Sequence, residues 1–140
     1  MTAVGSAYLG IDLGTSGLKL TLVDAAGSVV AGAEASYDVR SPQPGHAETD
    51  PADWRAALIG AGWMLSQRLD ALAAGVALRA IGVTGQMHGV VLVDAVGEPV
   101  RPAILWPDQR AESSLGAWEG LSVEARSRLG NPVVAGMADP

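Results

Sequence analysis

The sequence predicts an α/β fold in which a mixed sheet is flanked by helices. Residues 8–11 and 18–23 are two strands around a Gly-bearing turn, and residues 28–37 form a third strand after the turn 24–27. A helical pattern begins near residue 50, and the run 79–84 is apolar on both faces, which suits a central strand covered by helices. At 140 residues, the chain is long enough for one domain with its own core.

Composition excludes several classes of protein. Hydrophobic residues make up 49% and charged residues 17%, which argues against disorder over most of the chain. A net charge of −6 argues against nucleic acid or an anionic membrane surface as partners, and the lack of cysteine excludes disulfides and thiolate metal sites. There is no signal-peptide pattern, and the longest apolar stretch, 56–65, is too short to span a bilayer. We therefore expect a soluble, cytoplasmic protein.

The first turn, residues 14–17, carries the features of an anion site. Its glycines tolerate positive φ and let a ligand approach the backbone, and consecutive amides in such a turn suit an anion. Thr15 and Ser16 add hydroxyl donors, and Lys19 adds the nearest positive charge. Asp12 beside such a turn is a candidate for holding Mg²⁺, through water rather than directly. The alternative is an ordinary hairpin with a polar turn.

The helix after residue 50 has clear start signals. Asp50 can cap the free amides, Pro51 fits the first helical position, and Asp53 lies at the positive end. We expect Gly60 and Gly62 to permit close packing on the sheet. The apolar side chains that recur at three- and four-residue intervals are Trp54, Leu58, Ala61, Leu65, Leu69 and Leu72. We expect this helix to be structural.

The segment 85–89 follows the apolar strand, at the end where open α/β sheets place ligands. Two glycines bracket Gln86, Met87 and His88, so the bend presents three side chains. The structural alternative is a hydrogen-bonded loop histidine and a methionine that fills a gap in the core.

The last third of the chain predicts a second hairpin and two helices. Residues 90–94 and 99–105 form the hairpin, with its turn near Gly97. Asp108 is expected to cap a helix over 109–118, and a short helix over 123–128 precedes a breaker-rich tail. Arg110 lies near a helix start, where a cation is unfavourable, which suggests a functional role or a carboxylate partner.

This order of elements resembles the opening of the actin-like ATPase superfamily, with its ribonuclease H-like fold. Asp12-Leu-Gly-Thr-Ser-Gly-Leu-Lys19 is similar to the phosphate-1 signature there. Four further stretches resemble the FGGY carbohydrate kinases: Glu48-Thr-Asp-Pro51 with Trp54, Val83-Thr-Gly-Gln-Met-His-Gly89, Ala103-Ile-Leu-Trp-Pro-Asp-Gln-Arg110, and Gly130-Asn-Pro with Gly136-Met137. The resemblance implies that residues 1–140 are the first part of the N-terminal domain of such a kinase, without the rest of domain I and domain II.

The resemblance also implies a role for each matching residue. Asp12 would organise Mg²⁺ and the reacting groups, while Gly14, Thr15, Ser16 and Lys19 would contact the phosphates of ATP. The form 85–89 is similar to that of xylulokinases, so Gln86, Met87 and His88 would contact D-xylulose or a similar ketose. The second substrate-side motif would supply Trp106, Asp108 and Arg110.

The implied parent reaction converts ATP and D-xylulose to ADP and D-xylulose 5-phosphate. Family members are several times longer, so the general base, the phosphate-2 loop and the adenosine site would lie beyond Pro140, and we expect the 140 residues alone to be inactive. The expected partners are the ketose, ATP and the remainder of the polypeptide, with a homodimer possible. Two alternatives stay open: a kinase for another pentulose, hexulose or polyol, and a non-catalytic actin-like module that binds sugar or nucleotide.

Overall fold

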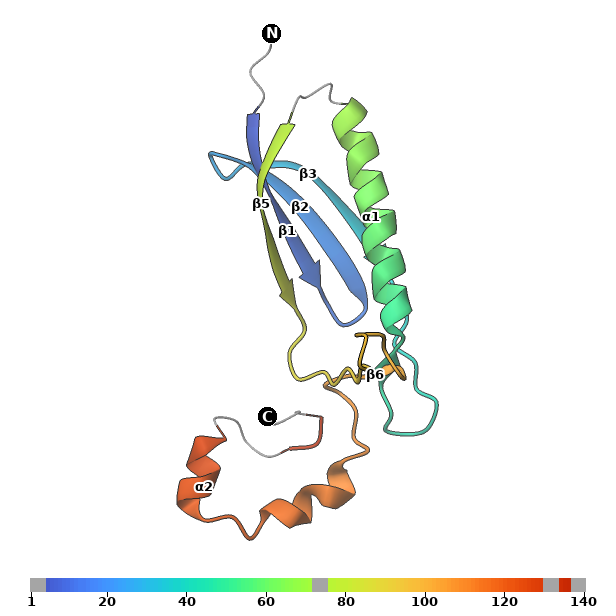
Figure 1. Ribbon diagram of the computed structural model, residues 1–140, viewed down its shortest axis with the longest axis vertical. Coiled ribbons are helices and arrows are strands. Elements are labelled where there is room, and N and C mark those ends of the chain that lie inside the picture. Colours follow the sequence, from blue (N-terminus) through green and yellow to red (C-terminus); the bar gives the residue numbers. More distant parts are fainter. Residues whose placement is uncertain (1–4, 72–75, 130–133, 137–140) are drawn as a thin grey trace. The chain divides into compact units, whose positions relative to one another are not determined.

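The computed structural model describes residues 5–71, 76–129 and 134–136 (Figure 1). The chain divides into two compact units. Unit 1 comprises Met1–Asp38 and Ala52–Gln86, and unit 2 comprises Val39–Pro51 and Met87–Pro140.

Unit 1 is built on a four-stranded mixed sheet. Its strands are β1 (Gly5–Leu13), β2 (Gly17–Asp24), β3 (Val29–Ser36) and β5 (Val76–Gly85), in the order β3-β2-β1-β5. The β1–β2 and β2–β3 pairs are antiparallel, and β5 runs parallel to β1. The predicted meander and mixed sheet are therefore confirmed.

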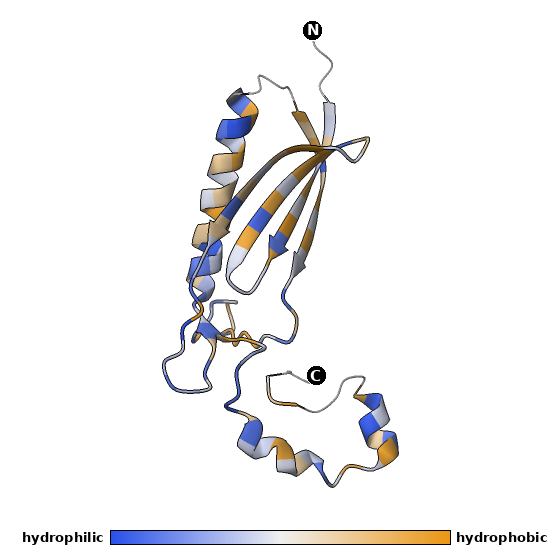
Figure 2. Ribbon diagram, turned by 180° about the vertical axis from the view of Figure 1, so that it is seen from behind, coloured by the Kyte–Doolittle hydropathy of each residue, from blue (hydrophilic) through white to orange (hydrophobic). Residues whose placement is uncertain are grey.

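Alternation along β2 separates the two faces of this sheet, and Figure 2 shows polar and apolar positions alternating along its strands. Leu18, Leu20 and Leu22 are buried on one face. Lys19 and Thr21 lie on the other, where Lys19 is opposite Asp12 of β1 in the strand register. The polar residues that the sequence nominated on β1 and β2 thus share the face opposite the core.

The core of unit 1 lies between the sheet and α1 (Pro51–Ala71), which begins at the predicted proline. Ala57, Ala61 and Leu65 of α1 pack in one cluster with Leu18 and Leu20 of β2. Leu58, placed in the apolar stripe by its spacing, is 41% exposed, because it is turned by about 100° from Ala57, which faces the sheet. Leu72 lies outside the described residues.

The two glycines of α1 do not have the predicted packing role. A Cβ at Gly60 or at Gly62 would meet no atom within 4 Å among the described residues. Neither position is therefore held to glycine by a close approach of the sheet.

Strand β5 differs from the covered central strand that its sequence predicts. Among the described strands it is at an edge of the sheet, and Ile81 and Val83 are 55% and 74% exposed. The reason is that α1 packs over β2 and β3, where the buried cluster lies. Its apolar side chains are left uncovered by the described residues.

Unit 2 contains little regular structure. Its two-stranded sheet pairs β4 (Glu48–Thr49) with β6 (Ala103–Ile104). The predicted hairpin is present as isolated bridges between Val93 and Pro99 and between Val90 and Ile104, with Gly97 at φ +88° in the turn. None of the described helices of the chain combines the length and apolar character needed to cross a membrane.

The helices of unit 2 confirm one prediction and correct another. Helix α2 (Val123–Arg128) has the predicted bounds, and the Ser122 hydroxyl accepts a bond from Ala125 N at its start. The helix expected over 109–118 is instead a 3₁₀ helix, η1 (Glu112–Trp118), and Asp108 does not cap it. The Asp108 carboxylate instead accepts hydrogen bonds from Arg110 and Ala47 N.

Candidate functional site

The backbone carbonyls of the turn between β1 and β2 accept several hydrogen bonds. Gly14 N donates to Gly17 O at 2.9 Å, and the Tyr37 hydroxyl lies 2.5 Å from Gly14 O and 3.1 Å from Gly17 O. The backbone N–H of Tyr37 donates to Ser16 O at 3.1 Å. Tyr37 is 9% exposed and belongs to the core cluster under α1. No local sequence pattern singled out this tyrosine.

The turn glycines are needed for space rather than for positive φ. Gly14 and Gly17 are not among the described glycines with positive φ. A Cβ on Gly14 would lie 3.1 Å from Gly17 O, and one on Gly17 would lie 3.2 Å from Ala35 O. These approaches are closer than ordinary van der Waals contact, so the turn is compact because it lacks side chains there.

A row of charges crosses the open face beside this turn. Asp12 is exposed near the end of β1, opposite Lys19 of β2, and Lys19 is opposite Glu34 of β3. The Lys19 ammonium lies 3.1 Å from the Glu34 carboxylate, and both side chains are well exposed. An exposed pair of this kind contributes little stability, so Lys19 can exchange its partner at small cost. Glu34 was not predicted.

Asp12 fits the donor set that Mg²⁺ uses beside phosphates. Mg²⁺ is usually held by one or two carboxylates together with water and phosphate oxygens. In the described part of the chain no group of three His, Asp or Glu side chains converges as a metal site. One exposed carboxylate beside an anion-type turn is compatible with a metal that is held mainly by water and nucleotide.

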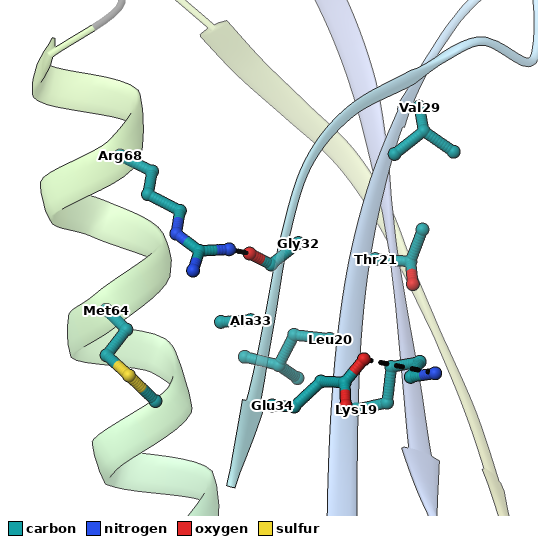
Figure 3. Close-up of a pocket in the computed structure, with 9 residues that line it drawn as sticks. All are labelled: Lys19, Leu20, Thr21, Val29, Gly32, Ala33, Glu34, Met64 and Arg68. Atoms are coloured by element: carbon teal, nitrogen blue, oxygen red, sulfur yellow. Dashed lines mark hydrogen bonds and ion pairs between the residues drawn. The ribbon is translucent and has the colours of Figure 1, made fainter.

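A hollow with a volume of about 390 Å³ lies along β2, β3 and α1. Figure 3 shows Arg68 reaching from α1 to the Gly32 carbonyl, to which it donates a hydrogen bond, and Lys19 paired with Glu34. Of the predicted site residues only Lys19 lines this hollow. The hollow is therefore not where the predicted site residues gather.

Gln86 joins the end of β5 to the end of β1. Its backbone N–H donates to Leu13 O at 2.8 Å. Both polar atoms of its carboxamide are buried, and neither has a hydrogen-bond partner among the described residues. Burying an amide without a partner is costly, so this side chain needs a partner from outside the described residues.

Met87 and His88 begin unit 2. Met87 is 73% exposed, so it does not fill a gap in the core that the described residues form. His88 has φ +60°, the only positive φ at a non-glycine position among the described residues. This region of backbone space is uncommon for a side-chain residue and collects at ligand sites. A Cβ on the next residue, Gly89, would make only an ordinary contact with the Ile104 carbonyl, at 3.6 Å.

Asp108 and Arg110 form the centre of a buried ionic cluster. The Arg110 guanidinium donates to both Asp108 oxygens and, at 2.7 Å, to Glu48, which also pairs with Arg101 at 2.6 Å. Asp108 is 2% exposed and accepts a further bond from Ala47 N at 2.7 Å. Of the two readings of Arg110 from the sequence, the structure supports the carboxylate partner.

The ionisation of this cluster follows from its bonds. Burial alone would raise the pKa of the Asp108 carboxyl, but the hydrogen bonds from Arg110 and Ala47 N outweigh it and hold that pKa well below its usual range. The hydrogen bond to Asp108 raises the pKa of the Arg110 guanidinium, despite its partial burial. Both groups are therefore charged over the whole neutral range.

Trp106 is 51% exposed at the start of the same segment. Gly136 packs against it: a Cβ on Gly136 would overlap the Trp106 carbonyl oxygen, and Gly136 has φ +85°. The other residues of that tail motif, from Gly130 to Pro132 and Met137, lie outside the described residues.

The predicted site residues thus fall into two sets. Asp12, the turn, Lys19 and Gln86 belong to unit 1, and Met87, His88, Trp106, Asp108 and Arg110 belong to unit 2. Sequence reasoning missed Tyr37, Glu34 and Arg101 and gave Glu48 no role, although Glu48 stands in a quoted motif.

Comparison with known proteins identifies the family. Residues 7–138 match the N-terminal domain of the FGGY family of carbohydrate kinases. The chain belongs to this family. The xylulose kinase of Escherichia coli K12 is 37% identical over 137 residues, which cover 95% of this chain and 27% of that protein. The xylulose kinase of Streptomyces coelicolor is 44% identical over 110 residues, 78% of this chain and 21% of that protein.

Solved structures of FGGY kinases have the same fold. A xyloylose kinase from Brucella ovis superposes with a TM-score of 0.82 at 39% identity, covering 94% of this chain and 27% of that one. The xylulose kinase of Rhodospirillum rubrum gives a TM-score of 0.78 at 31% identity, covering 85% and 24%. The actin-like ATPase fold expected from the sequence is confirmed. The chain spans about a quarter of the length of these relatives.

Proposed function

We propose that the polypeptide carrying this chain is an ATP-dependent kinase that transfers the γ-phosphate of ATP to D-xylulose, giving D-xylulose 5-phosphate. The observation that carries the proposal is the likeness to xylulose kinases across 95% of the chain. Residues 1–140 would be the first part of domain I of that enzyme. The general base and the adenine site would belong to other parts of the protein.

Unit 1 would serve the nucleotide. Gly14, Thr15, Ser16 and Lys19 would contact the ATP phosphates, with Lys19 leaving Glu34 for a phosphate oxygen. Asp12 would hold Mg²⁺ through water, and the metal when bound would neutralise charge on the phosphates. Phosphoryl transfer depends mainly on positioning and charge stabilisation, which are the tasks that these residues can perform.

The loop after β5 would serve the sugar. Met87 and His88 are exposed or partly exposed and stand on a strained bend, and the unpaired Gln86 carboxamide could bond a sugar hydroxyl or a neighbouring polar group. Trp106 would add an apolar surface. Asp108 is fully engaged, so we assign Asp108 and Arg110 to holding Trp106 in position rather than to touching the sugar.

The exposed apolar side chains of β5 support a further proposal about the remainder of the polypeptide. Leu78, Ile81 and Val83 are about half exposed or more in the described residues. Contiguous exposed apolar patches usually mark a surface covered in the complete protein. We propose that later segments of the same chain cover it. Cytoplasmic location and a homodimer stay predictions. Cell fractionation would test the location of the complete protein, and light scattering would test its oligomeric state.

A sugar panel tests the proposed function. The complete enzyme is incubated with ATP, Mg²⁺ and one of D-xylulose, D-ribulose, L-ribulose, gluconate or glycerol, and ADP release is followed. The highest kcat/KM is expected for D-xylulose, with the product verified by mass. A higher value for another substrate would favour a sibling kinase, and binding without turnover would favour a non-catalytic module. The 140-residue chain alone is the control and is expected to be inactive.

A further inference from the structure

Tyr37 combines three contacts to one turn with burial in the core. Its hydroxyl reaches Gly14 O and Gly17 O, and its N–H donates to Ser16 O. The single phenolic proton is shared between the first two carbonyls, so one residue after β3 contacts three carbonyls of the turn. Tyr37 thus contacts this turn through both its side chain and its backbone.

These contacts fix the direction of the turn's carbonyls. Tyr37 packs with Leu18, Leu20 and Ala57 in the cluster under α1, so the carbonyls bonded to its hydroxyl point toward the core. Asp12 and Lys19 lie on the opposite face of the sheet. The negative ends of the peptide dipoles are thereby kept away from the face that carries the phosphate-binding candidates, which favours an anion there.

We propose that Tyr37 is a positioning residue for the nucleotide: its hydroxyl holds the carbonyls of Gly14 and Gly17 on the core side, so that the turn presents its donors to the ATP phosphates. This inference rests on the proposed function, because it assigns Tyr37 to the phosphate turn of a kinase. Tyr37 itself touches no ligand in this scheme.

The Tyr37 phenol can donate to these carbonyls because it stays protonated. Burial raises the pKa of the Tyr37 hydroxyl, and the Asp12 carboxylate raises it further, while the bond to Gly17 opposes the shift. The hydroxyl is therefore a neutral donor at any pH near 7. Removal of the proton would place a negative oxygen against two carbonyls.

The test is Tyr37→Phe in the complete enzyme, with Tyr8→Phe as the matched control. Tyr8 is the only other tyrosine of the chain and is 42% exposed on β1 of the same unit. The variant keeps the ring that packs in the core and removes one donor. The KM for ATP and the Kd for ADP should rise about three- to tenfold, whereas the KM for the sugar should change less than about twofold. Tyr8→Phe should change none of them.

A second readout follows the turn itself. Amide hydrogen exchange, measured by mass spectrometry, should be faster at residues 14–17 in Tyr37→Phe. The reason is that Gly17 O, which accepts the hydrogen bond from Gly14 N, loses its contact with the Tyr37 hydroxyl. All measurements are made at a temperature where circular dichroism shows both variants fully folded. A purely structural tyrosine would lower the melting temperature without separating ATP from sugar.

The outcomes are distinct from those of the proposed function. Unchanged nucleotide affinity in Tyr37→Phe, or equal losses for ATP and sugar, overturns the positioning role. If the wild-type enzyme phosphorylates no sugar, the proposed reaction is wrong. The difference in Kd for ADP between wild type and Tyr37→Phe still tests the role of Tyr37. A wild-type protein that binds no nucleotide overturns both.

Discussion

The Arg110 guanidinium donates two hydrogen bonds to the Asp108 carboxylate, at 2.8 and 2.7 Å. A third bond links Arg110 to Glu48, and Ala47 N donates to Asp108. The segment that carries Trp106 is thus tied to a segment far earlier in the chain. A buried carboxylate with this many donors has no spare capacity for a sugar hydroxyl, which is why we treat the pair as the anchor of unit 2.

Asp108→Asn should be strongly destabilising. The change leaves Arg110 without one of its two carboxylates in a partly buried site, and breaking such a pair costs about 3–5 kcal/mol. Urea unfolding measures this loss in the free energy of unfolding. The control is Glu124→Gln, which breaks the exposed pair with Arg128 on α2 and should cost about 0.5 kcal/mol or less. Similar losses in the two variants would mean that the cluster does not anchor the unit.

Acid should remove the contribution of Asp108. Its pKa is lowered in the folded protein, so the stability that it contributes is fully present above the unfolded value of about 3.9 and is lost as the pH falls through the folded value. The difference in melting temperature between wild type and Asp108→Asn should therefore be constant from pH 7 to about pH 5 and shrink below about pH 4. A difference that persists unchanged at about pH 2 would contradict the assignment.

Local patterns predicted the parts of unit 1 that depend on neighbouring residues. The hairpin around residues 14–17 and the start of α1 at Pro51 follow from turn residues, alternation and capping, which act over a few positions. Leu58 shows the limit, because spacing alone could not decide between it and Ala57 for the face that meets the sheet.

Contacts between distant segments could not be predicted. Arg110 and Glu48 are separated by 62 positions, and Tyr37 reaches back 23 positions to Gly14. A local pattern indicated only that Arg110 was misplaced at a helix start. The exposed β5 has a related cause: its apolar run indicated a covered strand, but burial depends on what packs against it.

Asp12→Ala should strongly reduce turnover without unfolding the protein. Loss of the carboxylate would remove the group that holds the metal and its waters, which is worth several kcal/mol in the transition state, so kcat should fall by at least about a hundredfold. Asp12 is exposed, so the melting temperature should hardly change. Asp70→Asn, an exposed carboxylate on α1, is the control and should be fully active. Near-normal turnover in Asp12→Ala would show that the metal is held elsewhere.

Gly136→Ala should disturb Trp106, and Gly97→Ala is its matched control. Both glycines have φ near +85°, so alanine is strained at each by about 1–2 kcal/mol. A Cβ at Gly97 meets nothing within 4 Å, whereas one at Gly136 overlaps the Trp106 carbonyl. Urea unfolding should therefore show a further loss of about 1–3 kcal/mol in Gly136→Ala alone. Equal losses in the two variants would mean that the 134–136 segment does not pack on Trp106 in solution.

His88 allows function and backbone strain to be measured separately. Its φ of +60° is strained for any residue with a Cβ, so His88→Gly relieves a strain that His88→Ala retains. The glycine variant should be more stable than the alanine variant by about 1 kcal/mol. In the complete enzyme both variants lose the imidazole, and both should raise the KM for the sugar about three- to tenfold while leaving the KM for ATP within about twofold. If the KM for the sugar returned to the wild-type value in His88→Gly but not in His88→Ala, sugar binding would depend on the backbone conformation at residue 88 and not on the imidazole. Equal losses for sugar and ATP would return His88 to a structural role in the loop.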